Sequence, residues 1–195
     1  DLEFFGYAPA GMTSLPLFKW YARGIAFSFL VIAGFSFALA HRNGINGRTF
    51  INRLAQIGGA ALLISAATWF ATPDRFVFFG ILHQIAAAAL ISVLFLRANV
   101  SATLAAAVAI AAMPHLFRHE LFNAPWFWWT GLGTVQPATN DFVPVFPWTA
   151  YVLLGLALGK MALLRQFLTW PSATAPARSA PGRGLAFLGR HSLIY

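Results

Sequence analysis

The chain has 195 residues, of which 59% are hydrophobic and only 9% are charged, and its formal net charge is +8. A soluble domain carries about 25% charged residues, so this composition excludes a fold that covers its whole surface for water. These residues include no cysteine, which excludes disulfides and thiolate metal sites among them. Because the positive charges stand between apolar runs, we interpret them as topology signals and lipid-headgroup contacts, and we expect no nucleic-acid partner.

Five apolar stretches have about the 20 residues that a helix needs to cross a bilayer. They cover Trp20–Ala40, Leu54–Ala71, Phe76–Leu96, Val100–Leu116 and Phe146–Leu164, and a sixth begins near Leu185. Backbone groups in lipid must pair within their own segment, and these stretches do not alternate as barrel strands do, so we expect helices. The predicted fold class is all-α: a polytopic transmembrane helix bundle with five full spans plus the start of a sixth. Since the sequence starts at Asp1 and stops early in the sixth stretch, we expect both ends to be truncated.

Lysine and arginine are distributed unevenly between the two sets of connections. One set holds Arg42, Arg48, Arg53, Arg97, Lys160, Arg165, Arg178, Arg183 and Arg190, and the other holds Lys19, Arg23, Arg75 and Arg118. The positive-inside rule makes the richer side cytoplasmic, and all five acidic residues then fall on the other side. The alanine and arginine content hints at a bacterium, so we expect an integral protein of a bacterial inner membrane.

Two connections differ from the rest of the predicted single membrane domain, residues 1–195. Residues 115–144 form a long aromatic loop on the predicted extracytoplasmic side, with Trp128 inside a run of Trp and Phe. Such a cluster either marks the membrane interface or forms a surface on which a sugar stacks. Residues 169–184 are rich in Pro, Ala, Ser and Thr and are predicted to be a flexible cytoplasmic linker.

Ionisable groups in the spans are candidates for function because lipid makes them costly. His83 lies near the predicted outer end of the third span, where it is either a general acid–base group or a structural hydrogen-bonding residue. Gly80, about one turn earlier, would let a backbone or a substrate approach closely. Asp141 precedes the fifth span on the same predicted side, and it is either a solvated loop acid or a carboxylate that orients the histidine.

Further candidates lie at both predicted faces. Asp1 is either exposed or part of the outer pocket. On the cytoplasmic side, Arg53 either snorkels to the headgroups or binds the phosphates of a donor. Arg190, His191 and Ser192 open the last span, where Ser192 could cap the helix and the backbone N–H groups with Arg190 could also hold a phosphate.

Two further pairs have the spacing of a helix face. Gly155 and Gly159 form a small-xxx-small pair that predicts close helix packing. His115 and His119 are four apart, but Glu120 is the single carboxylate beside them, so we predict no metal site there.

Several short stretches together resemble one family. They are Gly34-Phe35-Ser36, Arg53 before the second span, Phe79-Gly80-Ile81-Leu82-His83, Asp141-Phe142-Val143-Pro144-Val145-Phe146-Pro147-Trp148, and Gly189-Arg190-His191-Ser192-Leu193-Ile194-Tyr195. Their order and spacing resemble the bacterial relatives of the heparan-α-glucosaminide N-acetyltransferase catalytic domain, which are multi-pass membrane acyltransferases. The resemblance covers nearly the whole chain. The family's key histidine lies on a helix upstream of a position like Asp1 and is not carried over to this sequence.

The resemblance implies an acyl-CoA-dependent O- or N-acyltransferase that moves an acyl group, acetyl being expected, from cytoplasmic acyl-CoA to an extracytoplasmic sugar or glycan. His83 and Asp141 match family positions, and their catalytic roles are our inference from chemistry. Asp1, Gly80, Trp128 and Trp148 are the expected acceptor-side residues. Arg53, Arg190, His191 and Ser192 are the expected donor-side residues.

Two alternatives remain open from the sequence. One is a transporter or flippase for a lipid-linked or small sugar-like substrate, and the other is a non-catalytic membrane assembly subunit. The expected partners are the lipid bilayer, acyl-CoA and the acceptor, with a homodimer as a further expectation.

Overall fold

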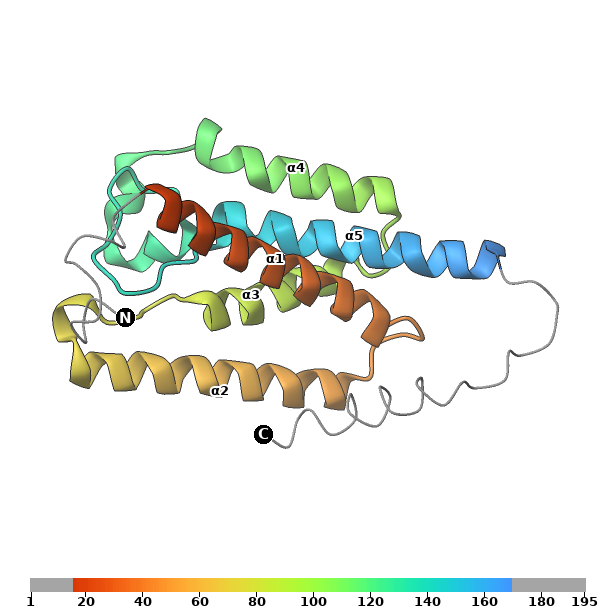
Figure 1. Ribbon diagram of the computed structural model, residues 1–195, viewed down its shortest axis with the longest axis horizontal. Helices are drawn as coiled ribbons and strands as arrows, with labels where there is room; N and C mark the ends of the chain where they lie inside the picture. The colour runs from red at the N-terminus through yellow and green to blue at the C-terminus, as the bar shows by residue number, and fades with distance from the viewer. Residues whose placement is uncertain (1–15, 170–195) are drawn as a thin grey trace. The chain divides into compact units, whose positions relative to one another are not determined.

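The apolar stretches form five α-helices in the computed structural model, which describes residues 16–169 (Figure 1). They are α1 (Pro16–Ala40), α2 (Gly47–Ala71), α3 (Ile81–Phe95), α4 (Val100–Leu116) and α5 (Val145–Thr169). Three short 3-10 helices lie in the connections: η2 (Pro73–Arg75), η3 (Glu120–Asn123) and η4 (Pro125–Thr130). Within these residues the only β-type pairing is an isolated bridge between Phe79 and Phe142. The prediction of an all-α helix bundle is confirmed.

Two predicted features lie outside the described residues. These are the start of a sixth span near Leu185 and the linker beyond residue 169. The chain divides into two units between residues 165 and 166, and the arrangement below concerns the first unit.

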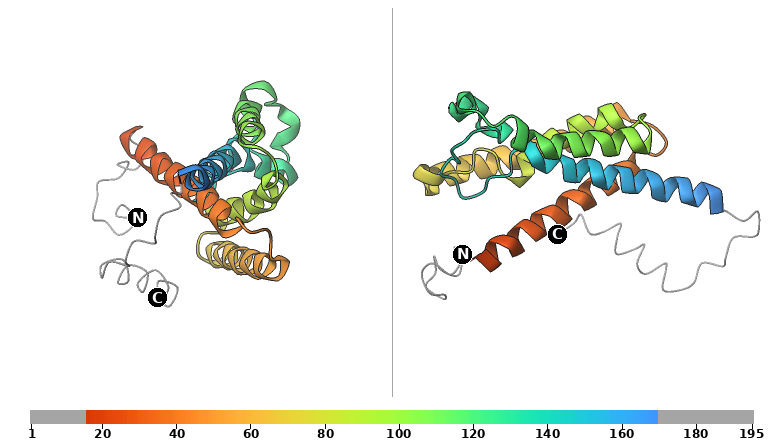
Figure 2. Two further views of the ribbon diagram at one scale, coloured as in Figure 1. Left: turned by 90° about the vertical axis from the view of Figure 1, so that its right-hand side faces the viewer. Right: turned by 90° about the horizontal axis from the view of Figure 1, so that it is seen from above.

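Successive helices run in opposite directions, so the connections gather at two ends of the first unit (Figure 1). One end holds the α1–α2 and α3–α4 loops, and we call it the Arg53 end. The other holds the start of α1, the α2–α3 connection and residues 115–144, and we call it the His83 end. Figure 2 shows α5 between α1 on one side and α3 and α4 on the other, which agrees with the apolar cluster that joins Ala38, Ala107 and Leu153.

Glycines bring α1 and α5 into close contact. A Cβ at Gly34 would overlap the backbone of Val152, and a Cβ at Gly155 would overlap the backbone of Val31. Gly159 faces Phe35 and Ala38 in the same way. Small residues at such positions let two backbones approach within a membrane, where dispersion contacts drive helix association. The helix-packing role predicted for Gly155 and Gly159 is confirmed.

Three helices are long and apolar enough to cross a membrane: Pro16–Ala40, Gly47–Ala71 and Val145–Leu164. The other two apolar helices, Ile81–Phe95 and Val100–Leu116, are shorter. At 1.5 Å per residue α3 is about 22 Å long, less than the roughly 30 Å of the hydrocarbon core. The expected third span from Phe76 is therefore wrong at its start, because residues 76–80 are extended and pair with residues 139–143.

Lys160 lies inside α5 and not in the connection that follows it. Its Nζ donates to the carbonyl oxygens of Phe95 and Ala98 and, at 3.0 Å, to Thr103 Oγ1. The last carbonyls of a helix lack partners within that helix, and a cation near them also complements the helix dipole. Lys160 therefore fixes the C-terminus of α3 and the α3–α4 loop to α5.

Candidate functional site

Two chain segments that are far apart in sequence run side by side at the His83 end. Asn140 N donates to Arg75 O at 2.9 Å, and Val143 N donates to Phe79 O at 3.1 Å. Thr139 Oγ1 donates to Phe76 O at 2.8 Å. Since buried backbone groups must be paired, these bonds hold residues 76–80 in an extended conformation and delay the start of α3.

Asp141 accepts a hydrogen bond from the first amide of α3. Its Oδ2 lies 2.8 Å from Ile81 N, so the carboxylate sits where the helix dipole favours a negative charge. Gly80, just before the helix, makes this approach possible, because a Cβ there would overlap the Asp141 carboxylate and the Val77 side chain. The group that approaches Gly80 is therefore the Asp141 side chain, where a backbone or a substrate was expected.

His83 stands in the first turn of α3 and uses both ring nitrogens. Gly80 N donates to Nδ1 at 3.3 Å, so in the neutral ring the proton is on Nε2. Nε2 lies 3.3 Å from Ser65 Oγ, and that hydroxyl donates to Val77 O at 2.6 Å. The bonds are therefore consistent only if Nε2–H donates and Ser65 Oγ accepts.

The structure brings the two predicted catalytic residues, His83 and Asp141, to one helix N-terminus. Both side chains are half-buried. The carboxylate contacts the backbone of α3, and Ser65 occupies the ring nitrogen that a directly orienting carboxylate would contact. Asp141 therefore binds the start of the helix that carries His83, and the hydrogen bonds of the His83 ring go to Gly80 and Ser65.

A cavity of about 850 Å³ lies at the same end of the bundle, and we call it the aromatic cavity. Trp128 and Trp148, both expected on the acceptor side, line it. Trp128 Nε1 donates to Asn123 O at 2.7 Å, which holds the indole in place. The ring centroid of Phe78 lies 5.6 Å from that of Trp128, so the segment that leads to Gly80 packs against a residue of the cavity wall, although neither Phe78 nor His83 lines the cavity.

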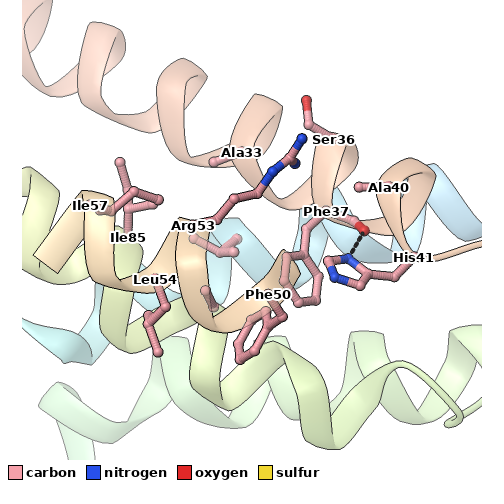
Figure 3. Close-up of a pocket in the computed structure, with 12 residues that line it drawn as sticks. Ala33, Ser36, Phe37, Ala40, His41, Phe50, Arg53, Leu54, Ile57 and Ile85 are labelled. Carbon is pink, nitrogen blue, oxygen red and sulfur yellow. Dashed lines mark hydrogen bonds between the residues drawn. The ribbon is translucent and has the colours of Figure 1, made fainter. Parts of the chain in front are cut away.

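A smaller pocket of about 200 Å³ lies between α1, α2, α3 and α5, and we call it the Arg53 pocket (Figure 3). Its polar lining residues are Ser36, His41 and Arg53, and the remaining walls are apolar. Arg53 extends from α2 toward Ser36 of α1, and the His41 ring binds Phe37 O at 2.9 Å. The pocket thus pairs a narrow apolar interior with a cation that can bind a phosphate.

Four of the predicted site residues lie outside the described residues. They are Asp1 on the expected acceptor side and Arg190, His191 and Ser192 on the expected donor side. Within residues 16–169, no group of three or more His, Asp or Glu side chains is placed to hold a metal ion.

Sequence reasoning missed Ser65 and His41. Ser65 stands in an apolar helix, where a serine resembles an ordinary packing residue, and its partners are 12 and 18 residues away. The weak signal was a second hydroxyl three residues later, because Thr68 Oγ1 accepts from Val77 N at 3.0 Å. His41 ends the first span beside a loop arginine, which could have marked it as a companion of Arg53.

One family of known proteins matches the chain. The family "Heparan-alpha-glucosaminide N-acetyltransferase, catalytic" matches over residues 1–195. No curated protein matches the chain, and no solved structure does.

Proposed function

Because the chain belongs to the heparan-α-glucosaminide N-acetyltransferase catalytic family, we propose that it is a membrane-embedded acyltransferase. It moves an acyl group from acyl-CoA to a sugar, and acetyl is the acyl group that the family name suggests. The family match over all 195 residues carries this proposal. The placement of two distinct sites at opposite ends of the bundle supports it, since a transfer across the bilayer needs a donor side and an acceptor side.

The donor enters at the Arg53 pocket in this proposal. The guanidinium of Arg53 binds a phosphate of the coenzyme, because its planar fork matches phosphate oxygens. The apolar walls formed by Leu54, Ile57 and Ile85 then take the thioester arm. This assignment places the Arg53 end in the cytoplasm, where acyl-CoA is made, in agreement with the lysine and arginine distribution.

The acceptor enters at the His83 end. Trp128 and Trp148 offer flat apolar surfaces on which a sugar ring stacks. His83 acts as the base that takes the proton of the hydroxyl or amine while that oxygen or nitrogen bonds to the carbonyl carbon of the thioester. The C–S bond then breaks, and the CoA thiolate takes up a proton as it leaves. The thioester arm must therefore extend from the Arg53 pocket toward the His83 end, where Ile85 lines the pocket two residues after His83.

Nδ1 of His83, the nitrogen that would take the proton, accepts a hydrogen bond from Gly80 N. This hydrogen bond must break before His83 can act as a base. The Asp141 carboxylate, which already accepts a hydrogen bond from Ile81 N, is close enough to accept one from Gly80 N instead.

The test is transfer by the protein in phosphatidylcholine nanodiscs supplied with radiolabelled acetyl-CoA and a mixture of sugars. Residues 1–195 contain no cysteine, so a thiol reagent measures released CoA without a background from these residues. We expect acceptor-dependent CoA release together with label on a sugar. Neither release nor transfer with any acceptor would refute the proposal and favour a transporter or an assembly subunit.

His83 is tested in the same assay with His83→Ala and His83→Gln. Both should abolish transfer while the protein still elutes and melts as a folded protein, with His83→Gln the more stable of the two because its amide oxygen can accept from Gly80 N. His119→Ala is the matched control, because His119 is exposed and its ring binds only the amide of Leu121. Full transfer by a folded His83→Gln protein would remove His83 from the chemistry.

A further inference from the structure

The aromatic cavity contains more positive charge than a site for a neutral sugar requires. Arg23 from α1 and Arg118 from the α4–α5 connection both line it, and His115 at the end of α4 lies beside them. The acidic residues among residues 16–169 are Asp74, Glu120 and Asp141, and none of them lines the cavity. The cavity wall formed by the described residues therefore carries two fixed positive charges and no negative one.

The two arginines come from segments that are far apart in the sequence and line the same cavity. Arg23 is exposed, and its guanidinium carbon stands 5.9 Å from the centre of the Trp20 ring, at the outer limit of a cation–π contact. Such a contact restricts the arginine while leaving its N–H donors available. Arginine donors present a planar fork that matches the oxygens of a phosphoryl group.

The rest of the wall suits a flat, partly apolar ring. Trp20, Trp128, Trp148 and Tyr151 contribute aromatic surface, and the volume of about 850 Å³ falls in the range of roughly 300–1,000 Å³ usual for small-ligand sites. Trp20 and the neighbouring Tyr21 are exposed at the start of α1. Tryptophan and tyrosine gather at the level of lipid headgroups, so we expect the cavity to open at the level of the phosphate groups of a bilayer.

We propose that the aromatic cavity binds a sugar that bears a phosphoryl group, with the phosphoryl oxygens on Arg23 and Arg118 and the sugar ring against the tryptophans. The phosphoryl sugar is either free or carried by a lipid that enters from the headgroup layer. This inference deepens the proposed function, on which it rests only for naming that ligand as the acyl acceptor.

Equilibrium binding of radiolabelled glucose 1-phosphate to the protein in phosphatidylcholine nanodiscs tests the inference. We expect saturable binding that weakens as salt is added, because exposed charges are screened. Arg23→Gln and Arg118→Gln should each weaken binding by about tenfold, since each removes charge-assisted hydrogen bonds to the phosphoryl group. Arg75→Gln is the matched control, because Arg75 is an exposed arginine at the same end that does not line the cavity.

Competitors separate the sources of the ligand. If phosphatidylinositol in the nanodisc displaces the labelled probe at lower concentrations than unlabelled glucose 1-phosphate does, the ligand is carried by a lipid. If unlabelled glucose 1-phosphate displaces the probe at the lower concentration, the ligand is a free sugar phosphate. Equal competition by glucose or glucuronate would overturn the phosphoryl assignment, as would an equal loss of binding in all three arginine variants. Phosphoryl-sugar binding without acyl transfer to any acceptor would refute the proposed function and leave the binding site standing.

Discussion

At the scale of single residues, Ser65 fixes the ionisable group on which the proposed chemistry depends. Gly80 N–H occupies Nδ1 of His83, so the ring proton is on Nε2, and Ser65 Oγ accepts it while donating to Val77 O. A histidine ring held at both nitrogens has one tautomer and one orientation. Ser65 thereby positions the His83 ring.

Ser65→Ala should lower the turnover of acyl transfer by up to about tenfold, because the His83 ring loses the hydrogen bond that holds Nε2, and such a bond contributes about 0.5–1.5 kcal/mol. The KM for acyl-CoA should not change, since the donor pocket lies at the other end. Ser28→Ala is the control, because the Ser28 hydroxyl binds only Gly24 O on the exposed side of α1. Equal activity of the two variants, with Ser65→Thr no better than Ser65→Ala, would show that Ser65 has no part in positioning the ring.

In the proposed function, Arg53 binds a phosphate of the donor at the Arg53 pocket. Arg53→Ala should raise the KM for acetyl-CoA by at least about tenfold, as expected for the loss of a charge-assisted hydrogen bond, with a smaller effect on turnover. Arg97→Ala removes the same charge from the same end, where Arg97 is exposed and does not line the pocket. If the two variants raise the KM equally, Arg53 contributes only general charge and the donor site lies elsewhere.

At the scale of elements, the contact between α1 and α5 depends on the absence of side chains at three glycines. Gly34 faces the Val152 backbone so closely that a methyl group must separate the two helices. Neighbouring packed side chains, including Leu30 and Leu156, are fully buried and leave no space for a shift.

Gly34→Ala should therefore lower the melting temperature in detergent by several degrees, as an overpacking cost of about 1–3 kcal/mol implies. Gly58→Ala on α2 is the matched change, because nothing lies within 4 Å of a Cβ placed there. It should leave stability unchanged or raise it, by up to about 1 kcal/mol, since alanine favours helix more than glycine. A Gly34→Ala protein that melts with Gly58→Ala would mean that α1 and α5 do not pack this closely in the membrane.

The helices could be located from hydropathy, and their ends could be located only in part. The prediction for α4 matches at both ends. Both α1 and α2 start earlier than predicted, and in α2 the added first turns include Arg48, Thr49 and Asn52, because polar residues beyond an apolar stretch still continue a helix. In α2 the true start is marked by Asn46, whose side chain accepts from Thr49 N at 3.2 Å. Hydropathy measures what lies in lipid, and a capping residue determines where the hydrogen-bonded helix begins.

The sequence predicted which candidate residues lie on the same side of the membrane. It did not predict the features of the candidate site that depend on pairing between distant segments of the chain. Counting spans placed His83 and Asp141 on one side of the membrane, and the structure brings them to one helix start. The extended conformation of residues 76–80 could not be foreseen, because it is imposed by residues 139–143, about 60 positions away. The partner of the imidazole, Ser65, depends on that same pairing and was missed for the same reason.

At the scale of the whole molecule, the proposed reaction requires a definite orientation in the bilayer. The donor pocket must face the compartment that holds acyl-CoA, so the Arg53 end must be cytoplasmic. The distribution of lysine and arginine predicts the same orientation independently of any site. Lys160 belongs to this end as well, although its charge is used to hold the carbonyls of Phe95 and Ala98.

Residues 1–195 contain no cysteine, so the orientation in the membrane can be measured by introducing one cysteine at a time. Asp74→Cys places an exposed thiol in η2 at the His83 end, and Ser101→Cys places one in the first turn of α4 at the Arg53 end. A membrane-impermeant maleimide should label the first thiol in intact cells and the second only after the cells are permeabilised. The opposite labelling pattern would place Arg53 away from acyl-CoA and would refute the assignment of its pocket to the donor. Labelling of both thiols in intact cells would show that the helices between them do not separate two compartments.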